Sequence, residues 1–103
     1  MGNSIKKEYN RLSITKDIVE RQNIIRQFQI TGFLDRNDAI KKIESIQVTD
    51  AELALATIAK QAQSGSVDLN KVDNNLIIAN MQFQIDFLTE KLAKLELEEK
   101  ENG

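Results

Sequence analysis

The chain has 103 residues, a formal net charge of −2, 41% hydrophobic residues and 29% charged residues. This length suits a single domain, and the composition is typical of a globular chain rather than of a disordered one. The sequence contains no Cys and no His, which excludes disulfides, thiol chemistry, the usual zinc ligands and nucleophiles activated by His.

The scarcity of helix-breaking residues predicts an all-α protein. The sequence has no Pro and only four Gly, and it is rich in residues that favour helices. No apolar run is longer than four residues, so we expect neither a membrane span nor a signal peptide, and we expect a cytoplasmic protein. Thirteen Ile, with many Lys and Asn, are typical of AT-rich coding sequences and favour a small bacterial or phage protein.

The apolar positions between residues 4 and 30 predict a first helix, but the pattern changes phase within it. Up to Leu12 the apolar residues lie on one helical face, and from Ile14 they restart on another. At about 100° per residue, these two side chains point roughly 160° apart. Either the helix breaks near Ser13–Thr15, or it continues and presents different faces to different neighbours.

Gly32 and Asp35 mark the connection to a second helix, expected over residues 35–47. Gly32 stands where a helix C-terminus commonly needs a left-handed residue, and we expect Phe33 and Leu34 to fold back onto the last turn. Asp35 has the position of the N-cap. The inward face of this helix is predicted to be Ala39, Ile40, Ile43 and Ile46, and its outward face Arg36, Lys41, Lys42 and Glu44.

Residues 50–64 are expected to form a third helix. Thr49 and Glu52 have the spacing of a capping box, in which two side chains reciprocally satisfy free backbone N–H groups. Five alanines make this helix thin, so neighbouring helices can approach it closely, and we expect it to lie at the centre of the bundle. The small polar residues Ser64–Ser66 then predict a loop.

The longest predicted helix spans residues 68–97, with Ser66 or Asp68 as its N-cap, and it is apolar on two sides. One side has the alternating three- and four-residue steps of a coiled coil, and we call it the seam: Ile78, Met81, Ile85, Leu88, Leu92 and Leu95. On the other side we expect Leu76 and Phe83 to be core residues. We expect one domain over residues 1–97 and a frayed acidic tail over 98–103, because acids oppose the dipole at a helix C-terminus.

Two arrangements would cover the seam. A second copy would pair with it as a parallel coiled-coil dimer, which is favoured by Ile at two a positions and Leu at two d positions. Alternatively, residues 14–30 fold back antiparallel along it within one chain. The helix, about 45 Å long, is expected to overhang the body, and its second apolar side also needs cover. Both points favour the dimer.

The sequence predicts no enzyme, no metal and no cofactor. Asp35 and Asp38 open a segment that begins like a calcium loop, but Ala39 and Ile40 stand where a ligand and Gly belong, and the twelfth position is Ile46 rather than Glu. The four glycines are too far apart for a phosphate-binding loop. Asp35 and Asp38 are therefore interpreted as the start of a helix.

The charge distribution permits a DNA-binding interpretation. Residues 1–45 carry nine basic and six acidic residues (+3), whereas residues 46–103 carry five and ten (−5). Residues 14–46 can be arranged as a helix–turn–helix whose possible nucleic-acid contacts are Lys7, Arg11, Arg21, Arg36, Lys41 and Lys42. However, the cations of the first helix scatter around its axis and the chain is acidic, whereas duplex-binding proteins concentrate basic residues on one surface.

The leading expectation is therefore a non-catalytic protein–protein interaction module. It would be a homo-oligomeric helical adaptor, inhibitor or assembly factor, encoded by a phage or another mobile element. It would self-associate through the seam and bind a further protein partner, with no role for a membrane. A small helical DNA-binding regulator is the alternative.

Overall fold

The computed structural model describes residues 11–65 and 67–102, except for the side chains of residues 47–49, 99, 101 and 102. The helices are α2 (Arg11–Thr31), α3 (Arg36–Thr49), α4 (Ala51–Gln63) and α5 (Asn74–Asn102), with a single 3-10 turn, η1 (Leu69–Lys71), before α5. These described residues contain no strand, and the predicted all-α fold of about four helices is confirmed.

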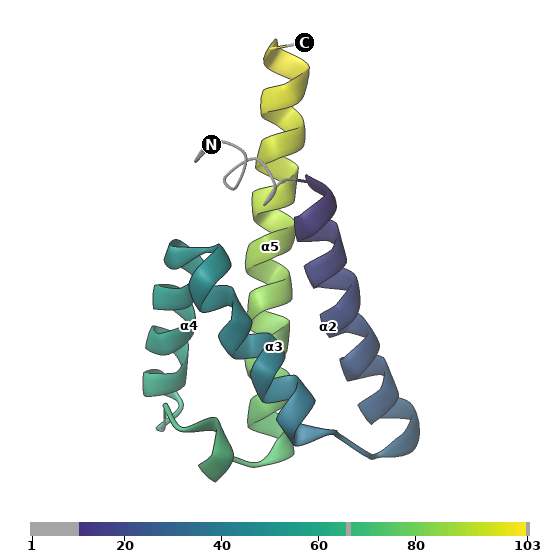
Figure 1. Cartoon of the computed structure of the whole chain (residues 1–103), viewed down its shortest axis with the longest axis vertical. Helices are drawn as coiled ribbons and strands as arrows, with labels where there is room; N and C mark the ends of the chain where they lie inside the picture. Colours follow the sequence, from purple (N-terminus) through teal and green to yellow (C-terminus); the bar gives the residue numbers. More distant parts are fainter. Residues whose placement is uncertain (1–10, 66, 103) are drawn as a thin grey trace.

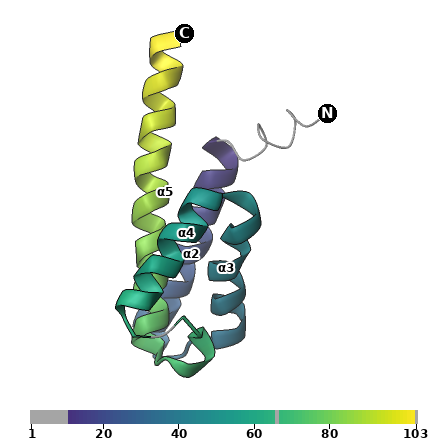
Figure 2. The same cartoon turned by 90° about the vertical axis from the view of Figure 1, so that its left-hand side faces the viewer.

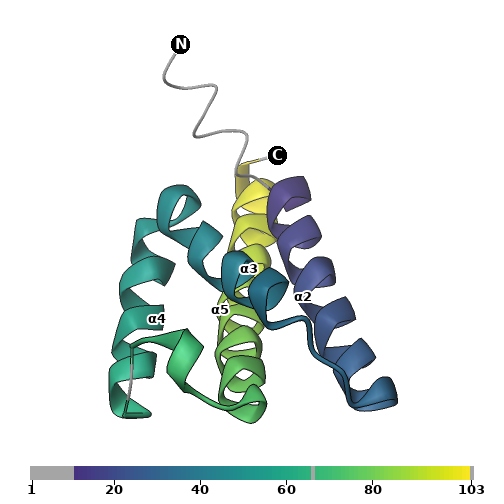
Figure 3. The same ribbon diagram turned by 60° about the horizontal axis from the view of Figure 1, so that its bottom comes forward.

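Helix α5 is the axis of the bundle. The other three helices each pack against it. Figures 1 and 3 show α2 running antiparallel to α5 on one side, α4 on the other side, and α3 between them. The expectation that the thin third helix lies at the centre is wrong: α4 packs mainly on α3 and α5, and its outer face, including Leu55 and Ala59, is exposed.

The C-terminal end of α5 projects beyond the other helices, as its predicted length indicated (Figure 2). The protein measures 44 × 27 × 24 Å, with a radius of gyration of 14.7 Å. The helix begins later than predicted, because Asp68 caps η1 and Val72 is extended, so that Asp73 caps α5 by accepting the Leu76 N–H at 2.9 Å. It also ends later, at Asn102 rather than Leu97, since Glu and Lys sustain a helical backbone well.

Helix α2 continues through Ser13–Thr15, which settles the two alternatives for this part of the first predicted helix. The Thr15 hydroxyl donates to the Arg11 carbonyl at 2.7 Å instead of capping a new helix. Leu12 is exposed whereas Ile14 is completely buried. The change of phase is therefore a change from the outer face of one helix to its inner face; residues 4–10 of the predicted helix lie outside the described residues.

The α2–α3 connection follows its local sequence signals closely. Gly32 has a φ of +73°, and its N–H binds the Phe28 carbonyl at 2.8 Å, which confirms the predicted left-handed C-cap. Asp35 accepts the Asp38 N–H at 3.2 Å, which confirms the predicted N-cap. Only half of the expected apolar contact forms, since Leu34 is buried but Phe33 remains 70% exposed.

A single aspartate separates α3 from α4. Asp50 is the N-cap of α4 and accepts the Leu53 N–H at 3.1 Å, while its own N–H binds the Ile46 carbonyl at the end of α3. The predicted capping box of Thr49 and Glu52 is therefore wrong, because Thr49 belongs to α3. Lys91 of α5 binds the other oxygen of Asp50 and ties this corner to the axial helix.

The apolar core lies between α2, α3, the inner face of α5 and the inner side of α4, which contributes Leu53 and Ala54. The inward residues predicted for α3 (Ala39, Ile40, Ile43 and Ile46) are all buried. On α5 the buried apolar face consists of Ile77, Met81, Ile85 and Leu88. Leu76 and Phe83, expected in the core, are only half-buried, because the side of α5 turned toward the core is mainly the seam, to which Met81, Ile85 and Leu88 belong.

Candidate functional site

The predicted seam is largely an internal surface of the chain. Met81, Ile85 and Leu88 are at most 4% exposed, because α2 and α3 cover them. Ile78, Leu92 and Leu95 are half-buried. For the centre of the seam, the structure therefore adopts the arrangement in which the chain covers itself, and these three side chains are not available to a second copy while α2 is in place.

The proposed nucleic-acid contacts do not form one surface. Arg21 is completely buried, which excludes it from phosphate contact in this fold. The Arg36 guanidinium binds Asn74 and backbone carbonyls around η1, and Lys42 forms an ion pair with Glu20 at 3.0 Å. Arg11 and Lys41 are exposed, and Lys7 lies outside the described residues. This placement lends no support to the DNA-binding alternative.

A buried polar network, missed by the sequence analysis, joins the four described helices. Arg21 of α2 donates to the Gln84 amide oxygen of α5 at 2.8 Å and to the Lys42 carbonyl of α3 at 2.6 Å. Gln84 donates in turn to the Ile43 carbonyl at 3.0 Å and to the Thr57 hydroxyl of α4 at 3.2 Å. Because Arg21 follows Ile14 and Ile18 on the same helical face, the periodicity of α2 already placed it inward.

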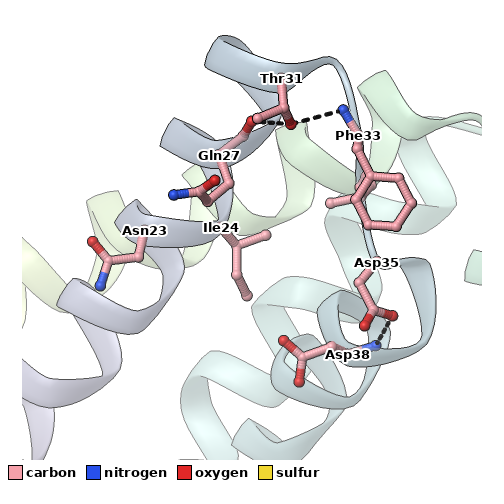
Figure 4. Close-up of a pocket in the computed structure, with 8 residues that line it drawn as sticks. Asn23, Ile24, Gln27, Thr31, Phe33, Asp35 and Asp38 are labelled. Atoms are coloured by element: carbon pink, nitrogen blue, oxygen red, sulfur yellow. Dashed lines mark hydrogen bonds between the residues drawn. The ribbon is translucent and has the colours of Figure 1, made fainter.

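A groove lies where the end of α2 meets the start of α3, and it has a volume of about 440 Å³. We call it the α2–α3 groove. Its lining residues are Asn23, Ile24, Gln27, Thr31, Phe33, Leu34, Asp35 and Asp38. Figure 4 shows the α2 side chains along one side, with Ile24 directed toward α3, and the two aspartates on the other side. Buried Leu34 and half-buried Ile24 supply its apolar contact surface.

The backbone around Phe33 is held by defined hydrogen bonds. The Thr31 hydroxyl donates to the Gln27 carbonyl at 2.7 Å and accepts the Phe33 N–H at 3.1 Å (Figure 4). Together with the left-handed Gly32, these bonds direct the chain so that Leu34 packs inward and the Phe33 ring stays outside. The exposed ring at the groove is therefore a consequence of a specific turn.

Of two other grooves, one has more charged lining residues and the other has a smaller volume. One of about 440 Å³ lies beside the start of α4 and the upper part of α5, and five of its seven lining residues are charged: Glu52, Glu90, Lys91, Lys94 and Glu98. The other, of about 260 Å³, lies between α3 and α4 and includes Ile58 and Val67. The α2–α3 groove is larger than the groove between α3 and α4, and it has fewer charged lining residues than the groove beside α4 and α5.

Neither a metal centre nor a membrane span is found in the described part of the chain. No group of three or more carboxylates is placed there to hold a metal ion. None of the described helices is both long and apolar enough to cross a membrane.

The fold and the groove define a small all-α protein of four described helices with an apolar recess between two of them. Comparison of the chain with protein-family models, curated proteins and solved structures found no match.

Proposed function

We propose that the chain is a non-catalytic protein-interaction module that binds a segment of a partner protein in the α2–α3 groove. The observation that carries this proposal is the 70% exposure of Phe33 beside a recess whose apolar contact surface is Ile24 and Leu34. Large aromatic side chains next to a pocket are typical anchors of protein interfaces. Adaptors, inhibitors and assembly factors would each use such a groove.

The size and rigidity of the groove support this proposal. A volume of about 440 Å³ falls within the range of roughly 300–1,000 Å³ that is usual for ligand clefts. The groove is formed by two helices whose ends are fixed by Gly32 and Asp35. A partner therefore meets a preorganised surface, which lowers the entropy lost on binding.

A selection from a library of random peptides tests the proposal directly. The immobilised full chain is the bait, and the affinity of the selected peptides is measured for wild type, Phe33→Ser and Leu55→Ser. Leu55 is the matched control because it is also 70% exposed but lies on α4. We expect Phe33→Ser to weaken binding at least about tenfold, as for an interface anchor, and Leu55→Ser to leave it unchanged.

Two results would contradict the proposal. One is the absence of any selected peptide above background. The other is a set of peptides that bind Phe33→Ser as tightly as wild type, which would place the recognition surface elsewhere on the chain.

Self-association is proposed only for the outer end of the seam. A second copy reaches Met81, Ile85 and Leu88 only if α2 leaves α5, whereas Leu92 and Leu95 are half-buried in the C-terminal half of α5. Sedimentation equilibrium at tens of micromolar on wild type and Leu95→Asp tests this. Self-association that Leu95→Asp leaves unchanged, or a strictly monomeric wild type, would contradict it.

A further inference from the structure

The charged residues that line the α2–α3 groove are all acidic. Asp35 and Asp38 are exposed at the start of α3, and the opposite side carries the neutral amides of Asn23 and Gln27. None of the lining residues is basic. The groove is therefore locally negative, although the N-terminal half of the chain carries a net charge of +3.

Two of the neighbouring basic residues are engaged elsewhere, and the exposed Lys41 and Arg26 do not line the groove. Arg36 donates to the Asn74 amide oxygen at 2.7 Å and to the Val72 carbonyl at 2.6 Å, on the side of α3 that faces η1. Lys42 is paired with Glu20. These contacts direct both cations away from the two groove carboxylates.

Neither groove carboxylate belongs to an ion pair within the described residues. Asp35 uses one oxygen to accept the Asp38 N–H as N-cap, which leaves its second oxygen facing solvent. The Asp38 carboxylate is not used as a cap, although its position in the first turn is favourable for the helix dipole. Both groups can therefore accept hydrogen bonds from a ligand.

We infer that the partner segment is amphipathic and basic, with a large apolar side chain that contacts Ile24, Leu34 and Phe33 and a neighbouring Lys or Arg that binds Asp35 and Asp38. This inference rests on the proposed function and names the chemistry of its ligand. Opposite charge across an interface fixes the register of the ligand and speeds its association. The apolar contact supplies most of the affinity, and the two carboxylates select partner segments that have a basic residue next to the apolar side chain.

The random-peptide selection on the full chain also tests this inference. The selected peptides are expected to be enriched in Lys or Arg next to Leu, Ile, Met or Phe. Their binding is compared for wild type, Asp38→Asn, Asp38→Lys and Glu44→Lys. Glu44 is the matched control, because it is an exposed acid of the same helix that does not line the groove.

We expect Asp38→Lys to weaken binding about three- to tenfold, Asp38→Asn to weaken it less, and Glu44→Lys to leave it within twofold of wild type. The difference between wild type and Asp38→Lys is expected to shrink at high salt, because exposed charges are screened over about 8 Å at physiological ionic strength. Circular dichroism checks that each variant is folded. If Asp38→Lys is unfolded, Asp38→Asn still tests the role of the carboxylate.

Three results would overturn the inference. If the peptides require Phe33 but are indifferent to Asp38, the groove binds its partner without basic residues, and only the proposed function stands. If they are indifferent to both residues, the proposed function fails as well. If the wild type self-associates and Asp38→Lys abolishes this, the occupant of the groove is a second copy of the chain.

Discussion

The Arg21 side chain of α2 donates to the Gln84 amide oxygen of α5 at 2.8 Å, and both side chains are completely buried. Gln84 is also bonded to α3 and α4, so one amide group links all four described helices. The charge of Arg21 is balanced by Asp17, whose carboxylate lies 3.6 Å away and is partly exposed. A buried cation with such specific contacts fixes the relative register of the helices around it.

The first prediction is that Gln84→Ala lowers the free energy of unfolding by about 2–4 kcal/mol, since it removes the acceptor of the buried Arg21 Nε–H. Urea denaturation measures this loss. The double variant Arg21→Met with Gln84→Leu is expected to be more stable than Gln84→Ala, because it replaces the polar pair by apolar groups of similar size. Arg26→Met is the control, because Arg26 is exposed on the same helix.

This prediction fails if Gln84→Ala is as stable as the control. It also fails if the two single substitutions, Arg21→Met and Gln84→Leu, are additive in a double-mutant cycle. Additive losses would mean that the two side chains do not stabilise one another.

The second prediction separates an internal seam from an interface between chains. Ile85→Asp combined with Leu88→Asp is expected to unfold the protein, because both side chains are buried within one chain. The free-energy cost of burying two unpaired carboxylates exceeds the total stability of a domain of this size, which is about 5–15 kcal/mol. Far-UV circular dichroism gives the helix content, and Thr89→Asp, at an exposed position between them and the projecting end, is the control. A folded monomeric double variant would show that the seam is an interface between chains.

Local signals in the sequence predicted the helix ends around the first connection. Gly32 and Asp35 act through backbone bonds within a few residues, so their roles did not depend on the rest of the fold. The capping box at Thr49 failed because Asp50, its neighbour, performs the same role for α4 and also ends α3. Where two candidate caps are adjacent, packing of the helices selects one of them.

Long-range packing explains what the sequence did not predict. A helix that is apolar on two sides does not determine its own buried face, and Ile77, which belonged to neither predicted side, is completely buried. The groove depends on how α2 and α3 are placed relative to one another and on which of Phe33 and Leu34 turns inward. The first property arises from the packing of both helices on α5, and the second from the local turn around Gly32.

The third prediction concerns the left-handed turn beneath Phe33. Gly32→Ala is expected to lower the free energy of unfolding by about 1 kcal/mol, because a Cβ is disfavoured at a φ of +73°. No atom lies within 4 Å of the position such a Cβ would occupy, so the loss is conformational rather than steric. Gly32→Asn is expected to lose less, since Asn tolerates this conformation better. Equal thermal stability of wild type and Gly32→Ala would contradict this prediction.

The last prediction assigns Arg36 a structural role in place of the nucleic-acid contact considered from the sequence. Its guanidinium binds the Asn74 side chain at 2.7 Å and the Val72 carbonyl at 2.6 Å, so it fixes the connection between η1 and α5 to the start of α3. Arg36→Met keeps the aliphatic stem but removes these charged hydrogen bonds, which is expected to cost about 1–3 kcal/mol and to lower Tm by at least about 4 °C. Lys41→Met removes the same charge from an exposed position of α3 and is expected to leave Tm within about 2 °C of wild type.

Equal Tm values for the two variants would contradict the structural role of Arg36. Faster amide exchange at residues 69–73 in Arg36→Met alone would locate the effect at this connection.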